Sequence, residues 1–185
     1  MSRNRAILII AIAAVLVLAG IWYTRRGGEA PAVIDLVHLF PAAELRPPGA
    51  GKDVFDIRDE KIAGETKRAI YAYPPTRIVW HVRLPNDGWL RTALGIDEQA
   101  WNKEGDGVLF LIGVSSEGRY TSLLEQHLDP HASRADRRWV SVMLDLSQYG
   151  GKQVDIIFNT RVSVRGNDAR NDFAYWGAPA VCLRP

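Results

Sequence analysis

From residue 33 onward, apolar side chains recur at every second position, and this period constrains the fold more than any other feature of the chain. The clearest segment, 154–165, places Val, Ile, Phe and Thr side chains on one side and Asp, Asn and Arg side chains on the other. Segments 78–84 and 139–146 alternate in the same way, and segment 108–114 is apolar on both faces. A period of two is typical of strands with one face in a core, and a strand apolar on both faces belongs inside a sheet.

Turn signals rich in Gly, Pro, Asn and Asp separate these segments, and no long amphipathic helix interrupts them. Only 97–103 has the composition for one helical turn. A chain of 185 residues has room for one domain of ordinary size and a terminal appendage. The sequence therefore predicts an all-β fold, an antiparallel jelly-roll β-sandwich over residues 33–185, with one N-terminal transmembrane helix.

The N-terminal appendage is an apolar run from Ala6 to Tyr23. As a helix, these residues span about 27 Å, close to the thickness of the hydrocarbon core of a bilayer. Bulky Trp22 and Tyr23 end the run where a cleaved signal peptide would need small residues, and Arg25 and Arg26 follow. We expect a cytoplasmic tip at 1–5, a transmembrane signal-anchor helix at 6–24 and a linker at 25–32, with a cleaved signal peptide as the alternative.

Charge and cysteine content exclude some classes of partner. The 23 Lys and Arg residues nearly balance the 21 Asp and Glu residues, and the excess positive charge flanks the apolar run. A nearly neutral domain lacks the basic face that a phosphate backbone requires, so nucleic acid is not an expected partner. The one cysteine, Cys182, lies between Val181 and Leu183 and reads as a small buried side chain.

Four segments of the domain carry a resemblance to a known family. They are Gly105–Phe110 (GDGVLF), Trp139–Lys152 with its Asp-Leu-Ser and Tyr-Gly-Gly motifs, the alternating strand 154–158, and Phe173–Pro179 with Trp-Gly-Ala-Pro. In this order they resemble galactose-binding-domain-like jelly rolls, the carbohydrate-binding-module-like domains of bacterial envelope proteins. The resemblance implies a binding module and favours a single-pass protein of the cell inner membrane, with its domain facing the periplasm or cell exterior. It leaves the ligand open, since the family includes sugar-binding, lipid-binding and purely structural domains.

Two loops have the composition of a sugar-binding site. An aromatic plane stacks on the apolar face of a pyranose, and amides and carboxylates bind its hydroxyls. We expect contacts from one loop near residue 101 and another near residue 170: Trp101, Asn102, Asn167, Asp168, Asn171 and Asp172. Trp101 has an alternative role as a core residue that caps the sandwich.

The same loops could hold a structural calcium ion, as many sandwich modules of the resembled group do. Asp106, Asp168 and Asp172 are the acidic loop residues available, and calcium takes several loop oxygens. The alternative reading is that they are solvated turn residues. No catalytic residue is singled out: Gly113–Glu117 ends in Glu where a nucleophile elbow needs Gly, and no pair of carboxylates stands out.

Three functions remain after these exclusions. The first is a membrane-anchored extracytoplasmic binding module that recognises carbohydrate and is not an enzyme, which predicts an exposed aromatic groove. The second is an accessory or scaffold subunit that binds another envelope protein, which predicts a large apolar patch. The third is a small hydrolase, which predicts a cleft with convergent ionisable groups.

Overall fold

The computed structural model describes residues 32–47, 49, 51–163 and 168–184. They belong to a compact unit spanning Ala32–Pro185. The expected tip at 1–5, the anchor helix at 6–24 and nearly all of the linker at 25–32 lie outside the described residues. Within the described part of the chain, no helix is long and apolar enough to span a bilayer.

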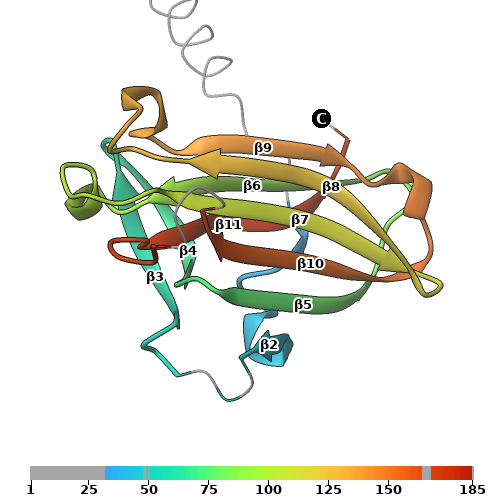
Figure 1. The fold of residues 1–185 in the computed structure, drawn as a ribbon. Helices are drawn as coiled ribbons and strands as arrows, with labels where there is room; N and C mark the ends of the chain where they lie inside the picture. The colour runs from blue at the N-terminus through green and yellow to red at the C-terminus, as the bar shows by residue number, and fades with distance from the viewer. Residues whose placement is uncertain (1–31, 48, 50, 164–167, 185) are drawn as a thin grey trace, which may run out of the picture. The chain divides into compact units, whose positions relative to one another are not determined.

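The unit consists of two antiparallel sheets connected by loops and short 3-10 turns (Figure 1). The six-stranded sheet contains β1 (Ala32–Asp35), β3 (Phe55–Ile62), β4 (Glu65–Ala72), β6 (Gly88–Ile96), β9 (Val140–Asp145) and β11 (Ala174–Leu183). The five-stranded sheet contains β2 (Glu44–Arg46), β5 (Thr76–Arg83), β7 (Val108–Ser116), β8 (Arg119–Leu128) and β10 (Gln153–Val162). The 3-10 turns are η1 (Phe40–Ala42), η2 (Glu98–Ala100), η3 (Arg134–Asp136) and η4 (Ser147–Tyr149).

Strand order shows how the chain builds the sandwich. The five-stranded sheet runs β2-β5-β10-β7-β8, and the six-stranded sheet runs β3-β4-β11-β6-β9, with β1 beside the second half of β11. Successive strands from β4 to β7 alternate between the sheets, as do those from β8 to β11, so most pairings join segments far apart in sequence. The predicted all-β antiparallel sandwich is confirmed, and η2 is the helical turn expected within 97–103.

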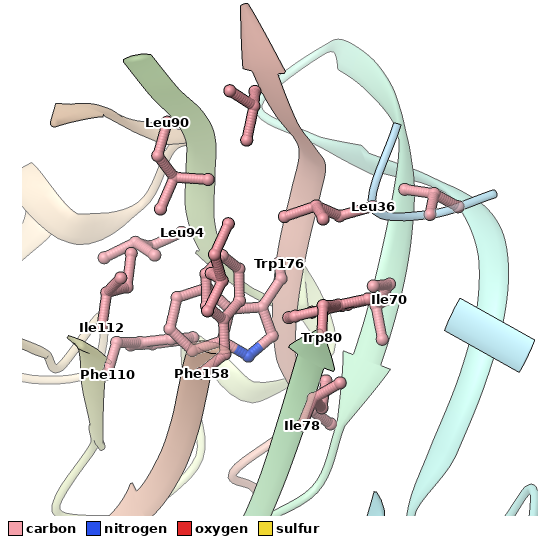
Figure 2. Packing of buried hydrophobic residues seen from close by; sticks show 14 of the residues in the cluster. Leu36, Ile70, Ile78, Trp80, Leu90, Leu94, Phe110, Ile112, Phe158 and Trp176 are labelled. Atoms are coloured by element: carbon pink, nitrogen blue, oxygen red, sulfur yellow. The ribbon is translucent and has the colours of Figure 1, made fainter. Parts of the chain in front are cut away.

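Aromatic rings fill the space between the sheets (Figure 2). The Trp176 ring centroid lies 4.4 Å from that of Phe158 and 4.9 Å from that of Phe110, and Trp80 meets Phe158 at 5.0 Å. Thr160 occupies an inward position of β10 because its hydroxyl accepts a hydrogen bond of 3.0 Å from Trp176 Nε1. Satisfying a buried indole N–H explains why a threonine interrupts an otherwise apolar face.

A second apolar cluster covers the outer face of the six-stranded sheet. The Trp139 ring packs where Gly95 and Gly177 carry no side chain, and a Cβ at either glycine would overlap it. Its Nε1 donates a 3.0 Å hydrogen bond to the carbonyl of Glu65. The six-stranded sheet therefore has an apolar cluster on its outer face as well as on its core face.

Candidate functional site

The outer face of the five-stranded sheet carries a groove of about 560 Å³. Its lining comes from all five strands: Glu44, Arg46, Arg77, Val79, His81, Leu111, Ser115, Tyr120, Ser122, Asp155, Ile157, Asn159 and Arg161. These residues share a face because side chains alternate along each strand and the register aligns neighbouring strands. The groove is therefore formed by regular secondary structure and not by loops.

The middle of the groove has an apolar floor. Val79 on β5, Ile157 on β10 and Gly113 on β7 are cross-strand neighbours in one row. Leu111 continues this floor two residues along β7. Apolar atoms at the bottom of a groove favour a ligand that also has an apolar surface.

Tyr120 provides an exposed aromatic ring above this floor. It lies on β8, its side chain is 51% exposed, and its ring covers the backbone of Gly113. Any Cβ at Gly113 would overlap the ring carbons and the hydroxyl of Tyr120, so the glycine is what allows the ring to lie over β7. An exposed ring beside polar groups is the arrangement that stacks on a sugar.

Polar groups at fixed positions border the ring on one side. His81 Nδ1 donates a 2.7 Å hydrogen bond to Asp155 Oδ1, and His81 Nε2 lies 3.9 Å from Glu44 Oε2. Asp155 in turn faces Ser115 across the strands, and Ser115 faces Tyr120. Both imidazole nitrogens thus face carboxylates, which holds the ring in place as part of a hydrogen-bonding border.

Arginines border the opposite side. Arg46, Arg77 and Arg161 extend the groove into an adjoining hollow of about 480 Å³, which is also lined by Asn159. Arg77 Nε donates a 2.7 Å hydrogen bond to Asn159 Oδ1, and Arg46 pairs with Glu44 at 2.7 Å. The groove therefore joins an aromatic platform to a positively charged end.

The sequence-predicted site lies elsewhere, at the loops that connect strands. Trp101 is partly buried, its Nε1 donates to the carbonyl of Ile96 at 3.0 Å, and the Arg137 guanidinium lies 5.9 Å from its ring centroid. The ring packs against the cluster around Trp139 and Tyr175. This environment fits the alternative role of a packing residue, while its neighbour Asn102 is exposed.

The two predicted loops do meet. Asn171 Nδ2 donates to the carbonyl of Glu104 at 3.0 Å, and the backbone of Asp168 approaches Asp106 Oδ2 at 3.4 Å. Asn167 lies outside the described residues. Together these contacts close one end of the sandwich, and the hollow between them measures only about 20 Å³, too small for a sugar.

Two acidic residues at this end, Asp168 and Asp172, have pKa values shifted in opposite directions. Hydrogen bonds from the Arg170 side chain and backbone hold the pKa of Asp168 at about 2. Burial, together with the charges of Asp106, Asp168 and Asp129, raises the pKa of Asp172 to about 8. One oxygen of Asp172 and one of Asp106 are buried without a hydrogen-bond partner. Crowded carboxylates of this kind are stabilised by protonation or by a cation.

The expected calcium ion gains no ligand set from these side chains. Among the described residues, no three His, Cys, Asp or Glu side chains are arranged to hold a metal ion. The described part of the loops thus offers a small hollow and a buried Asp172, whose raised pKa favours the protonated carboxyl at neutral pH.

Sequence reasoning missed the groove because its members are scattered over five strands. The signal available was Gly113 in the middle of the apolar segment 108–114, since a glycine inside a strand often marks close approach of another group. Tyr120 follows seven residues later, beyond a Glu-Gly turn. Only the register, which sets Ser115 opposite Tyr120, brings that ring over the glycine.

Both the sequence and the fold have relatives among known proteins. No family model matches the sequence. An uncharacterized protein of Archaeoglobus fulgidus is 30% identical over 128 residues, which cover 65% of this chain and 32% of that protein. The chain thus spans about a third of the length of this relative.

Solved structures give a closer description of the domain. The CBM51-2 and INT domains of Clostridium perfringens ZmpB match with a TM-score of 0.53 and 19% identity, covering 81% of this chain and 31% of theirs. The CBM51 of a Clostridium perfringens GH95 protein, solved with methyl-galactose, matches with a TM-score of 0.50 and 16% identity, covering 80% of this chain and 98% of its own. The domain has the galactose-binding-like fold of carbohydrate-binding modules. Because both structures are less than 20% identical to this chain, the similarity establishes its fold and nothing about its ligand.

Proposed function

We propose that this chain is a non-catalytic carbohydrate-binding module whose glycan lies in the groove of the five-stranded sheet. The observation that carries the proposal is the exposed Tyr120 ring on Gly113, above an apolar floor and beside fixed polar groups. A pyranose has an apolar face and a rim of hydroxyls, so it matches this combination of stacking surface and hydrogen-bonding border. The CBM51-2 of Clostridium perfringens ZmpB, which shares the fold, has been solved with GlcNAc.

A binding role fits the groove better than catalysis does. His81 is the one imidazole in the lining, and its two nitrogens face Asp155 and Glu44. The two carboxylates of the lining are also paired, Asp155 with His81 at 2.7 Å and Glu44 with Arg46 at 2.7 Å. The two Clostridium perfringens structures that share this fold are named as carbohydrate-binding modules. Their names also support a binding role for this chain.

We further propose that the hydrophobic segment 6–24 anchors the module in the membrane and displays it outside the cytoplasm. Support comes from the length of the apolar run, from the aromatic residues that end it and from the basic residues that follow it.

An accessory subunit would need a broad apolar surface. The large hydrophobic side chains most exposed in the described residues are Val33, Tyr120, Met143 and Leu183, which come from four different strands.

Substitution of Tyr120 tests the glycan site. With the purified full chain in a non-ionic detergent, affinity electrophoresis against a panel of polysaccharides should identify at least one that is retained. Tyr120→Ala should weaken that binding by about tenfold or more, because a stacking aromatic commonly acts as a binding hot spot. The melting temperature should hardly change, since the ring is half exposed.

Two control variants sharpen the result. Tyr120→Phe keeps the ring and should retain most of the affinity. Trp101→Ala should instead lower stability by about 3 kcal/mol while leaving glycan affinity unchanged, because it removes a packed ring far from the groove lining. Retention of no polysaccharide by the wild type, or equal retention by Tyr120→Ala, would contradict the proposal.

A further inference from the structure

The arginine end of the groove gives information about the kind of glycan. Arg46 and Arg77 are direct cross-strand neighbours on β2 and β5. Arg77 is the neighbour of Asn159 on β10, and Arg161 lies two residues farther along the same face of β10. Three guanidinium groups from three strands therefore line one hollow, which is continuous with the groove through the residues that they share.

The carboxylates of the groove pair with only one of the three arginines at this end, Arg46. Glu44 pairs with Arg46 at 2.7 Å and approaches His81, and Asp155 accepts a hydrogen bond from His81. Arg77 uses its Nε on the neutral amide of Asn159, which leaves the two terminal nitrogens of its guanidinium for another acceptor. Within the described residues, Arg77 and Arg161 have no carboxylate within ion-pair distance.

Like charges held together at a groove favour an anionic ligand. A guanidinium presents parallel N–H groups that match both oxygens of a carboxylate, and it binds sulfate groups through the same donors. Asn159, which is almost fully buried, fixes the position of Arg77 before any ligand binds. Arg77 on β5 and Gly113 on β7 lie two strands apart, in rows that are offset by two residues. At about 4.8 Å between strands and about 3.4 Å per residue, the two positions are about 12 Å apart. A short glycan lying across these strands can contact both Tyr120 and the arginines.

We propose that the groove selects an acidic glycan, with the anionic group of one sugar on Arg77 and Arg161 and a neighbouring sugar stacked on Tyr120. This inference rests on the proposed function, because it assumes a glycan in the groove. The chemistry shared by the candidate ligands is a sugar that carries a carboxylate or a sulfate ester. Neutral glycans would leave the arginines without a partner and should bind more weakly.

Matched polysaccharide pairs test the charge requirement. Binding of the full chain in non-ionic detergent would be measured for polygalacturonate against its methyl-esterified form, and for dextran sulfate against dextran. The first pair tests a carboxylate and the second a sulfate ester. At least one acidic member should bind about tenfold or more tightly than its neutral counterpart, and this preference should shrink as added salt screens the charges.

Arginine variants assign the preference to this end of the groove. Arg77→Gln and Arg161→Gln should each lower affinity for the acidic polysaccharide by about fivefold to tenfold while affecting the neutral form little. Arg161 is exposed, so its variant should fold even if removal of Arg77 disturbs β5. Arg68→Gln, which changes an exposed arginine of the other sheet, is the control and should bind as the wild type does.

The outcomes separate this inference from the proposed function. Equal binding of acidic and neutral forms, with Tyr120→Ala still defective, would overturn the acidic preference and leave the glycan site standing. Equal binding of polyglutamate, an anion without sugars, would also overturn it, because the arginines would then be reading charge alone. Failure of every polysaccharide to bind would remove the proposed function itself.

Discussion

Asp172 is a carboxyl group in a place that opposes its ionisation. It is 2% exposed, one of its oxygens has no hydrogen-bond partner, and its pKa is raised to about 8 from an ordinary value of 3.8. The folded state therefore binds this proton more tightly than the unfolded chain does. The resulting contribution to stability is fully present below about pH 4 and is lost as the pH rises toward and through 8.

Replacement of Asp172 by Asn should remove this pH dependence. Asn keeps the shape of the side chain without the charge, so Asp172→Asn should unfold like the wild type near pH 4 and be more stable by about 1 kcal/mol or more at pH 8. Thermal unfolding of both proteins at the two pH values measures the difference. If the free energy of unfolding of Asp172→Asn fell between pH 4 and pH 8 as much as that of the wild type, Asp172 would not be the source of the pH dependence. Its carboxyl group would then ionise in the folded protein without a loss of stability.

At the scale of elements, the pairing of β7 with β8 creates the platform. Gly113 leaves a gap in the face of β7, and the register places Tyr120 of β8 where its ring covers that gap. The groove thus depends on a contact between two neighbouring strands. The chemistry of its border then comes from β2, β5 and β10, whose side chains are aligned by the same ladder.

Gly113→Ala should separate binding from folding. The atoms nearest to the new Cβ belong to the far end of the Tyr120 side chain, which can move into solvent, so stability should change by less than about 1 kcal/mol. Glycan affinity should fall nearly as much as in Tyr120→Ala, because the ring can no longer lie over β7.

Gly107→Ala provides the contrast. Gly107 has a positive φ of 80°, and a Cβ there would overlap the carbonyl oxygen of Leu128, which cannot swing away. This variant should lose stability strongly. Glycan binding by Gly113→Ala at the wild-type level would contradict the prediction. The Tyr120 ring would then not need to lie over Gly113, and this arrangement would be irrelevant to binding.

At the scale of the whole molecule, the chain joins a hydrophobic segment to a β-sandwich domain that we propose binds glycan. Alkaline phosphatase fused to the C-terminus should be active in a bacterial host, because this enzyme folds only after export and the domain is proposed to lie outside the cytoplasm. The basic flanks of the segment are nearly balanced, so the activity of the fusion, and not the charge of the flanks, reports the orientation. A silent phosphatase fusion, together with a fluorescent cytoplasmic reporter at the same position, would place the domain inside.

The sandwich could be predicted because its signal is local. Alternation of apolar and polar residues indicates which side chains of a strand face the core, as in segments 78–84, 139–146 and 154–165. Polar turn residues mark where each strand ends. The structure confirms these faces: Val154, Ile156 and Phe158 are buried in the core cluster. The two loops chosen for their composition, near residues 101 and 170, lie together in the structure, where Asn171 donates to the carbonyl of Glu104.

The candidate site was decided by the tertiary structure. Trp101 has the composition of a binding residue, yet a hydrogen bond to Ile96 and packing against the aromatic cluster make it part of the scaffold. Tyr120 is an unremarked residue in the sequence, and it becomes a platform only because β8 pairs with β7 beside Gly113. Arg46, Arg77 and Arg161 likewise converge from three strands, although Arg46 and Arg161 are 115 residues apart in the sequence. Period and turn chemistry reside in neighbouring residues, so the sequence by itself determined the strands and their faces. The groove depends on which strands pair and in what register, and those long-range contacts exist only in the folded chain.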